Sequence, residues 1–142
     1  MRKNVMDYEV VNDIKAEDIY YLRKLIGWKD LPVEQFEKGI KNTMCSVTVR
    51  NDKDVIAVGR IVGDYASKGL LTDIMVNPKY QKQGFGRIVV TNLLEQASSF
   101  IKEGEQFHIE GTPTSGNRDF YVRCGMKYKP ENQDGVYVWL KK

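Results

Sequence analysis

The chain has 142 residues, 22 Lys and Arg against 19 Asp and Glu, a net charge of +3 and 42% hydrophobic residues. This length and composition predict one folded domain, residues 1–142, and exclude a disordered segment or a long multidomain protein. A nucleic-acid partner would require a strongly basic domain with clustered charge. No apolar stretch approaches the ~20 residues of a membrane helix, so neither nucleic acid nor a membrane is expected as a partner.

The cysteines, the histidine and the amino-terminal residues bear on the cellular compartment. Cys45, Cys124 and a single histidine are too few for a disulfide framework or a zinc site, so no metal is expected. Polar and acidic side chains at residues 4–9 stand where a secretory signal would carry its apolar core. These observations predict a cytoplasmic protein.

The first third of the chain predicts two helices after an opening strand. Residues 5–11 alternate loosely between apolar and polar side chains, and apolar residues then recur at helical spacing over 14–26 until Gly27. Pro32 suits the first position of a second helix, whose apolar residues extend to about Thr43. Both helices therefore precede most of the sheet.

The middle of the chain predicts a hairpin, then a strand, a long helix and another strand. Alternation over 45–50 and 55–62, on either side of an Asn-Asp-Lys-Asp turn, indicates an antiparallel hairpin. A strand over 70–76 leads to the strongest helical pattern of the chain, 84–102, and to a strand over 106–110. Two strands joined through a helix in this way lie parallel in one sheet.

The last third predicts a short helix over 117–124 and a final alternating strand over 135–141. The resulting fold is an α/β (α+β) domain. Its sheet is mixed and mostly antiparallel, with a central parallel strand pair and helices on both faces. The final strand is expected at a sheet edge, where it allows pairing with a second copy in a homodimer.

The turn before the long helix carries the chemistry. Main-chain N–H groups at a helix start lack helical partners, and Gly84 and Gly86 let a ligand approach them without meeting a Cβ. Lys79, Lys82 and Arg87 add positive charge nearby. The turn therefore suits a pyrophosphate, the alternative being that the glycines only turn the chain and the lysines only face solvent.

Two common phosphate-binding loops do not fit this turn. A P-loop would carry Lys-Ser or Lys-Thr after its last glycine, where Arg87 and Ile88 stand. A dinucleotide-binding turn would need a third small residue where Val89 stands and an acidic residue closing the next strand, for which Glu110 is a poor match.

Three motifs together resemble the GNAT superfamily of acyl-CoA-dependent N-acyltransferases. The most specific is Val-x-Pro-x-Tyr-Gln-x-x-Gly-x-Gly over 76–86. Phe-Tyr-x-x-x-Gly-Met over 120–126 follows it in the expected order, with Met in place of the family's last Phe. Leu-Arg-x-x-x-Gly-Trp over 22–28 is similar to a pattern among small bacterial members.

The resemblance implies acetyl-CoA as the acetyl donor, bound in a splay between the two parallel strands. It implies pantetheine along the first of these strands and pyrophosphate on the glycine turn. Many members carry a cofactor-contacting Asn where this chain has Thr114, so Asn117 or Ser115 is expected to substitute. The other implied cofactor contacts are Ile74, Met75, Val76, Gln81, Lys82, Gln83, Gly84, Phe85, Gly86 and Arg87.

Acetyl transfer requires a neutral amine, stabilisation of the oxyanion and a proton for the departing thiolate. Tyr121 is the expected acid, since its reference pKa of about 10 is near that of a thiol, about 8.5. A bulge near Met75 or Val76 is expected to free a backbone N–H for the oxyanion. Asp73 and Glu110 are the candidate bases; the alternatives for Asp73 are that it orients the amine or that it is a surface acid.

Four other residues have structural alternatives. Trp28 is a candidate for the acceptor pocket or for plain packing after the first helix. Cys45 and Cys124 are expected to be buried hydrophobes rather than nucleophiles, and His108 a structural residue.

The predicted function is an N-acetyltransferase that moves acetyl from acetyl-CoA to a primary amine of a small molecule or peptide, by direct attack in a ternary complex. Transfer of a longer acyl group is one alternative. A catalytically silent acyl-CoA-binding sensor or interaction module is another. Tyr121 favours the enzyme, because a sensor has no need of a proton donor there.

Overall fold

One sheet runs through the computed structural model, which describes residues 7–114, 116–132 and 134–142. The strands are β1 (Glu9–Val11), β2 (Thr43–Arg50), β3 (Val55–Gly63), β4 (Lys68–Val76), β5 (Gln106–Gly111), β6 (Lys127–Tyr128) and β7 (Val136–Lys141). The helices are α1 (Ala16–Ile26), α2 (Val33–Ile40), the short 3-10 helix η1 (Pro78–Tyr80), α3 (Phe85–Ser98) and α4 (Arg118–Arg123). The strand order is β1-β2-β3-β4-β5-β7-β6.

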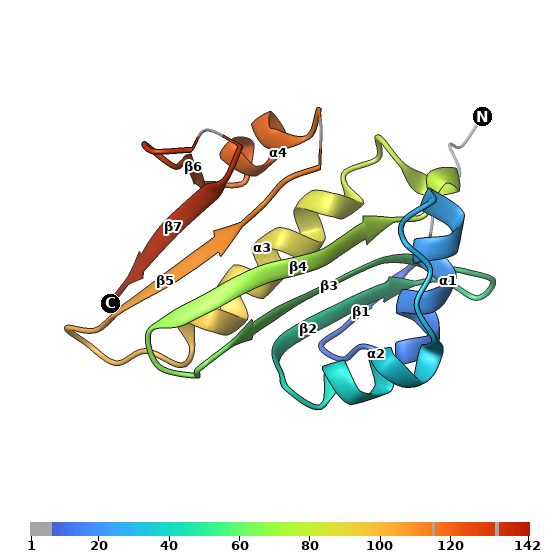
Figure 1. Cartoon of the computed structure of the whole chain (residues 1–142), viewed down its shortest axis with the longest axis horizontal. Helices are drawn as coiled ribbons and strands as arrows, with labels where there is room; N and C mark the ends of the chain where they lie inside the picture. Colours follow the sequence, from blue (N-terminus) through green and yellow to red (C-terminus); the bar gives the residue numbers. More distant parts are fainter. Residues whose placement is uncertain (1–6, 115, 133) are drawn as a thin grey trace.

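Helices cover both faces of the sheet, as predicted (Figure 1). On one face α3 buries Leu93 in a core that it shares with Ile109 of β5. On the other face α1 and α2 bury Leu22 and Phe36 against Met75 of β4. No helix in the described part of the chain is long and apolar enough to span a membrane.

The central strands β4 and β5 are parallel, which confirms the predicted crossover. Their pairing runs only from Lys68 with His108 to Leu70 with Glu110. Beyond these pairs the two strands separate, so the side of β4 that faces β5 has no ladder partner over residues 71–76 within the described chain. This opening between β4 and β5 is the splay that positions the site.

A β-bulge lies in β4 at the splay. Between Thr72 and Met75, β4 has two residues where β3 has one, and Asp73 adopts a left-handed φ of 54°. A bulge was expected near Met75 or Val76. The structure places it slightly earlier, at Asp73 and Ile74, and a bulge takes backbone groups out of the regular ladder.

Two helices are shorter than their apolar patterns predicted. Pro32 is the extended cap before α2 rather than its first helical residue, and α2 ends at Ile40 because Thr43 already pairs in the sheet. The long helix α3 ends at Ser98 rather than at 102. Ile101 is still buried, from the loop that follows, so burial extends the apolar pattern past the helix end.

The two ends of the sheet also differ from prediction. The opening strand covers Glu9–Val11 rather than 5–11, and residues 5 and 6 lie outside the described residues. The final strand β7 is not at the edge, because it lies between β5 and the two-residue strand β6. Strand β6 went unpredicted since two residues are too short for a periodic signal.

Candidate active site

A cavity of about 820 Å³ opens at the splay of β4 and β5. Its walls come from the end of α1, from β4, from the glycine turn, from the segment after β5 and from α4. Met75 and Phe85 line it although their side chains belong to the two cores. The sequence-predicted site residues that line the cavity are Trp28, Asp73, Ile74, Met75, Val76, Gln81, Lys82, Gly84, Phe85, Gly86, Arg87, Asn117 and Tyr121.

The glycine turn has a backbone suited to an anion. Lys82 and Gly84 both adopt left-handed φ, 64° and 90°, and Gly84 caps the start of α3. The first helical hydrogen bond of α3 runs from the Ile88 N–H to the Gly84 carbonyl at 3.2 Å, so the three preceding amides have no partner within the helix. The side-chain amide of Gln81 donates to the Val76 carbonyl at 3.2 Å and fixes the turn to the end of β4. The three unpartnered backbone N–H groups at the start of α3 can converge on a pyrophosphate.

The two glycines of the turn have different structural reasons. A Cβ at Gly84 would meet nothing within 4 Å, so this residue leaves open space beside the backbone. A Cβ at Gly86 would lie 3.1 Å from Cζ of Phe120 and 3.6 Å from Val76. Ligand approach therefore explains Gly84, whereas Gly86 lets α4 pack on the first turn of α3.

The basic residues near the glycine turn fall into two groups, those that line the cavity and one that does not. Lys82 and Arg87 line the cavity, where their charge complements a phosphate. Lys79 does not line it; its Nζ lies 3.1 Å from Oδ2 of Asp54, and this hydrogen bond raises the pKa of Lys79. Lys79 therefore belongs to a pair between η1 and the β2–β3 turn.

Tyr121 of α4 lines the same cavity and is half-buried. Burial raises the pKa of its phenol to about 12, and the neighbouring Cys124 contributes to the same shift. No described residue hydrogen-bonds the hydroxyl, and no buried polar side-chain atom of the described residues lacks a partner, so this hydroxyl is open to the cavity. The phenol therefore stays protonated over the whole physiological pH range, and its pKa lies further from that of a thiol than the reference value does.

Asp73 is not a surface acid, which removes one of its sequence-based alternatives. Its side chain is only 9% exposed, and its two oxygens face two guanidinium groups. Nε of Arg60 donates to Oδ2 at 2.7 Å, and Nη1 of Arg23 lies 3.5 Å from Oδ1. Because both oxygens are engaged by cations, this carboxylate is better suited to positioning than to accepting a proton.

Glu110 and Gln83 do not line the cavity with the other predicted residues. Oε2 of Glu110 lies 2.6 Å from Nζ of Lys129, and this hydrogen bond lowers the pKa of Glu110. A lowered pKa makes a carboxylate a weaker base. No sequence pattern indicated Lys129, which reaches Glu110 from the segment after β6.

The expected substitute for the family's Asn lies at the cavity wall. Nδ2 of Asn117 donates to Oγ1 of Thr114 at 2.7 Å, and both residues line the cavity. Ser115, the other candidate, lies outside the described residues. Asn117 and Thr114 therefore form one polar group between β5 and α4.

Arg23 lines the cavity and had no predicted role, although it stands in the Leu-Arg-x-x-x-Gly-Trp motif. Its guanidinium lies 5.5 Å from the ring of Trp28 and 5.4 Å from that of Phe36. Nη2 donates to the Lys29 carbonyl at 2.8 Å. The arginine thus fixes the loop that carries Trp28 at the wall of the cavity.

Neither cysteine lines the cavity. Cys45 is 2% exposed and burial raises its pKa to about 11, which keeps the thiol protonated and unreactive. Cys124 is half-buried and its pKa is also raised by burial. Across the described ranges, no three His, Cys, Asp or Glu residues are grouped to hold a metal ion.

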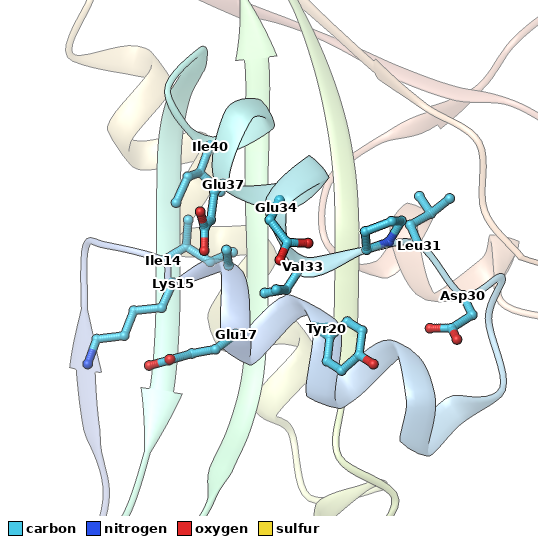
Figure 2. A pocket seen from close by; sticks show the side chains of 12 residues that line it. Ile14, Lys15, Glu17, Tyr20, Asp30, Leu31, Val33, Glu34, Glu37 and Ile40 are labelled. Carbon is cyan, nitrogen blue, oxygen red and sulfur yellow. The ribbon is translucent and has the colours of Figure 1, made fainter.

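A second hollow, of about 1020 Å³, lies between α1 and α2 (Figure 2). Figure 2 shows Glu34 and Glu37 of α2 on one side and Glu17 and Tyr20 of α1 on the other. It contains no residue of the glycine turn, of β4 or of α4. The glycine turn and Tyr121 therefore line the first cavity and not this hollow.

Known proteins match this chain over most of its length. The model of the Acetyltransferase (GNAT) family matches residues 12–126. GCN5-related N-acetyltransferase 2, chloroplastic, from Arabidopsis thaliana is 24% identical over 87% of this chain, and histone acetyltransferase TAP1 from Glycine max is 22% identical over 88%. The chain spans little more than half the length of these two relatives, 55% and 57%.

Solved structures share the fold. A probable acetyltransferase from methicillin-resistant Staphylococcus aureus is 25% identical, with a TM-score of 0.77 over 89% of this chain and 95% of that one. A GNAT family N-acetyltransferase (YhbS) from Escherichia coli, in complex with CoA, is 17% identical, with a TM-score of 0.69 over 99% and 85%. Because the family model matches most of the chain, and the splayed strands and the glycine turn agree with it, this chain belongs to the GNAT family of acetyltransferases, whose acetyl donor is acetyl-CoA.

Proposed function

We propose that this protein transfers the acetyl group of acetyl-CoA directly to a primary amine within a ternary complex. One observation carries the proposal: a single cavity is lined both by an anion-binding turn and by Tyr121, whose hydroxyl is open. A CoA pyrophosphate fits the open space at Gly84, and pantetheine fits the β4 edge that β5 leaves unpaired in the described chain.

When bound, acetyl-CoA supplies the thioester that the amine attacks. In the overall reaction a C–N bond forms, the C–S bond breaks, the amine loses one proton and the sulfur gains one. Backbone N–H groups at the β4 bulge lie outside the regular ladder and are placed to stabilise the oxyanion. The hydroxyl of Tyr121 donates to the leaving sulfur.

The proton of the amine leaves to water in this scheme. Asp73 is engaged by Arg23 and Arg60, and Glu110 is paired with Lys129 outside the cavity. We assign Asp73 a positioning role at the acceptor end, beside Trp28. An amine with a pKa near 10 is partly neutral at mildly alkaline pH, which is sufficient without a protein base.

The test is an amine-panel assay that follows CoA release, with wild type and Tyr121→Phe run together. The variant keeps the ring and removes the hydroxyl, so turnover should fall by ~10² to 10⁴-fold while the dissociation constant of acetyl-CoA stays unchanged. Loss of acetyl-CoA binding in Tyr121→Phe would instead assign Tyr121 to packing. Tight acetyl-CoA binding with no CoA release from any amine would favour the silent binding module, and faster turnover of a longer acyl-CoA would revise the donor.

A further inference from the structure

The guanidinium of Arg23 is largely removed from solvent at the acceptor end of the cavity. Its side chain is 16% exposed, and it is held between the rings of Trp28 and Phe36 and the Lys29 carbonyl. A charge removed from water in this way requires a compensating partner of opposite charge. The extent to which Asp73 supplies that partner decides what the cavity can bind.

Distances assign Asp73 mainly to Arg60. The Arg60 contact, 2.7 Å, is a short charge-assisted hydrogen bond, whereas the Arg23 contact, 3.5 Å, is at the outer limit of one. Arg60 is satisfied further by Oγ1 of Thr43 at 3.1 Å, and it does not line the cavity. One carboxylate therefore faces two guanidinium groups, and the under-compensated one, Arg23, is the one that lines the cavity.

The rest of the cavity does not supply the missing negative charge. Asp73 is the only acidic residue among those that line it in the described chain, and Lys82, Arg87 and Arg123 join Arg23 as basic residues. Lys82 and Arg87 belong to the phosphate-binding turn. Arg23 comes from α1 and is held by the Trp28 ring, the Lys29 carbonyl and Asp73, none of which belongs to that turn.

We propose that the acceptor is an amine that also carries an anionic group, a carboxylate or a phosphate, and that Arg23 binds this group. This inference rests on the proposed function and adds its substrate class. A planar guanidinium with N–H groups beyond those held by Lys29 and Asp73 can take a carboxylate or phosphate in bidentate fashion. A cationic acceptor such as a polyamine would meet excess positive charge and bind poorly.

The experiment compares matched amines that differ in the anionic group. Phosphoethanolamine is paired with ethanolamine and β-alanine with β-alaninamide, with spermidine as the cationic reference. Each kcat/KM is calculated on the concentration of unprotonated amine, because the two compounds of a pair differ in amine pKa. The anionic member of at least one pair should be preferred by about tenfold or more, and the pair concerned identifies phosphate or carboxylate.

Variants of the two arginines separate a binding role from a structural one. Arg23→Gln should abolish the preference, and Arg23→Lys should keep part of it, because the charge remains without the planar fork. Arg60→Gln leaves Asp73 to compensate Arg23 alone, so it should weaken the preference without abolishing it, because the Arg23 guanidinium still lines the cavity. A binding measurement of N-acetyl-β-alanine against its amide, with CoA present, checks each variant without turnover.

Equal rates within both pairs, or an unchanged preference in Arg23→Gln, would overturn the inference. The inference would also be overturned if the protein bound acetyl-CoA but neither bound nor acetylated phosphoethanolamine or β-alanine. Failure of acetyl-CoA to raise the melting temperature would mark a different failure, that of the proposed function itself. Variants that melt at the wild-type temperature and are stabilised by acetyl-CoA are folded. In these variants the ratio of kcat/KM between the two compounds of a pair decides the question.

Discussion

Gly86 and Phe120 are in packing contact, because a Cβ at Gly86 would lie 3.1 Å from the Phe120 ring. This contact joins the first turn of α3, at the anion-binding turn, to α4, which carries Tyr121. This one close approach therefore sets the positions of the glycine turn and Tyr121 relative to each other. A change at Gly86 should act on Tyr121 through Phe120 rather than on the cofactor directly.

Gly86→Ala should lower turnover while changing stability by no more than about 1 kcal/mol, because the better helix propensity of Ala offsets part of the crowding. Phe120→Leu makes room for the new methyl group, so turnover in the double variant should exceed that of Gly86→Ala alone. The measurements are kcat and the melting temperature in a double-mutant cycle. Independent effects of the two changes on turnover would show that α3 and α4 are not coupled at this contact.

Acetyl-CoA at a hundredfold excess over its dissociation constant should stabilise the protein by about 2.7 kcal/mol, if it binds only the native state. Gly84→Ala should weaken this effect strongly, because a Cβ would occupy the open space at the start of α3. Gly104→Ala is the matched control, since Gly104 has a φ of 87° against 90° and also has open space. Both changes should strain the backbone by ~1–2 kcal/mol, and only the first should reduce the acetyl-CoA response in a thermal-shift titration.

Lys82→Ala, an exposed residue of the same turn, should reduce that response less than Gly84→Ala does, because a single solvated charge is screened by salt. A larger effect for Lys82→Ala would mean that side-chain charge, rather than the backbone amides, holds the pyrophosphate.

The pH profile depends on the raised pKa of Tyr121, about 12 against an ordinary value of 10.0. A raised phenol pKa keeps the proton donor intact as pH increases, so activity should rise as the amine is deprotonated and should show no fall below about pH 11. Tyr121→Phe should show the same rise at a lower rate. A falling limb near pH 10 that is present in wild type and absent from the variant would show that the phenol is not desolvated.

Asp73→Asn should lower the free energy of unfolding by about 3 kcal/mol or more, because it leaves two largely buried guanidinium groups without a carboxylate. Asn tolerates the left-handed backbone of this residue, so the loss reports charge rather than strain. Glu110→Gln breaks an exposed pair and should change stability by less than about 1 kcal/mol. Urea denaturation measures both.

Turnover in the same two variants distinguishes positioning from base catalysis. A stable Asp73→Asn protein whose turnover falls 10²-fold or more at neutral pH, and recovers as rising pH deprotonates the amine, would make Asp73 a base. A fall in turnover of 10²-fold or more in Glu110→Gln, with acetyl-CoA binding retained, would make Glu110 one.

Local rules explain the parts of the fold that the sequence predicted well. The apolar period locates α1 and α3, Gly27 ends α1 with a left-handed φ of 78°, and the strand–helix–strand order predicts the parallel pair. The same rules locate the glycine turn, because its glycines and the start of α3 follow one another in the sequence. Boundaries failed where the sheet competes for a residue, as at Thr43, which pairs in β2.

The electrostatic partners could not be predicted, because they come from distant elements. Asp73 lies 50 residues from Arg23 and 13 from Arg60, and no period relates their positions. Nor does any local pattern indicate that Glu110 is paired with Lys129. Residue types at a site can therefore be proposed from sequence, whereas their protonation and free capacity depend on tertiary contacts.

The short contact between β4 and β5 has a consequence for the motions of the molecule. Three residue pairs join a leaf of β1 to β4 with a leaf of β5, β7 and β6 (Figure 1). A ligand bound in the splay would contact both parts of the sheet. It would replace some of the hydrogen bonds that β4 and β5 do not make with each other, and so connect the two parts. Amide hydrogen exchange in β5 and β7 should then slow on cofactor binding even at residues that the cofactor never touches.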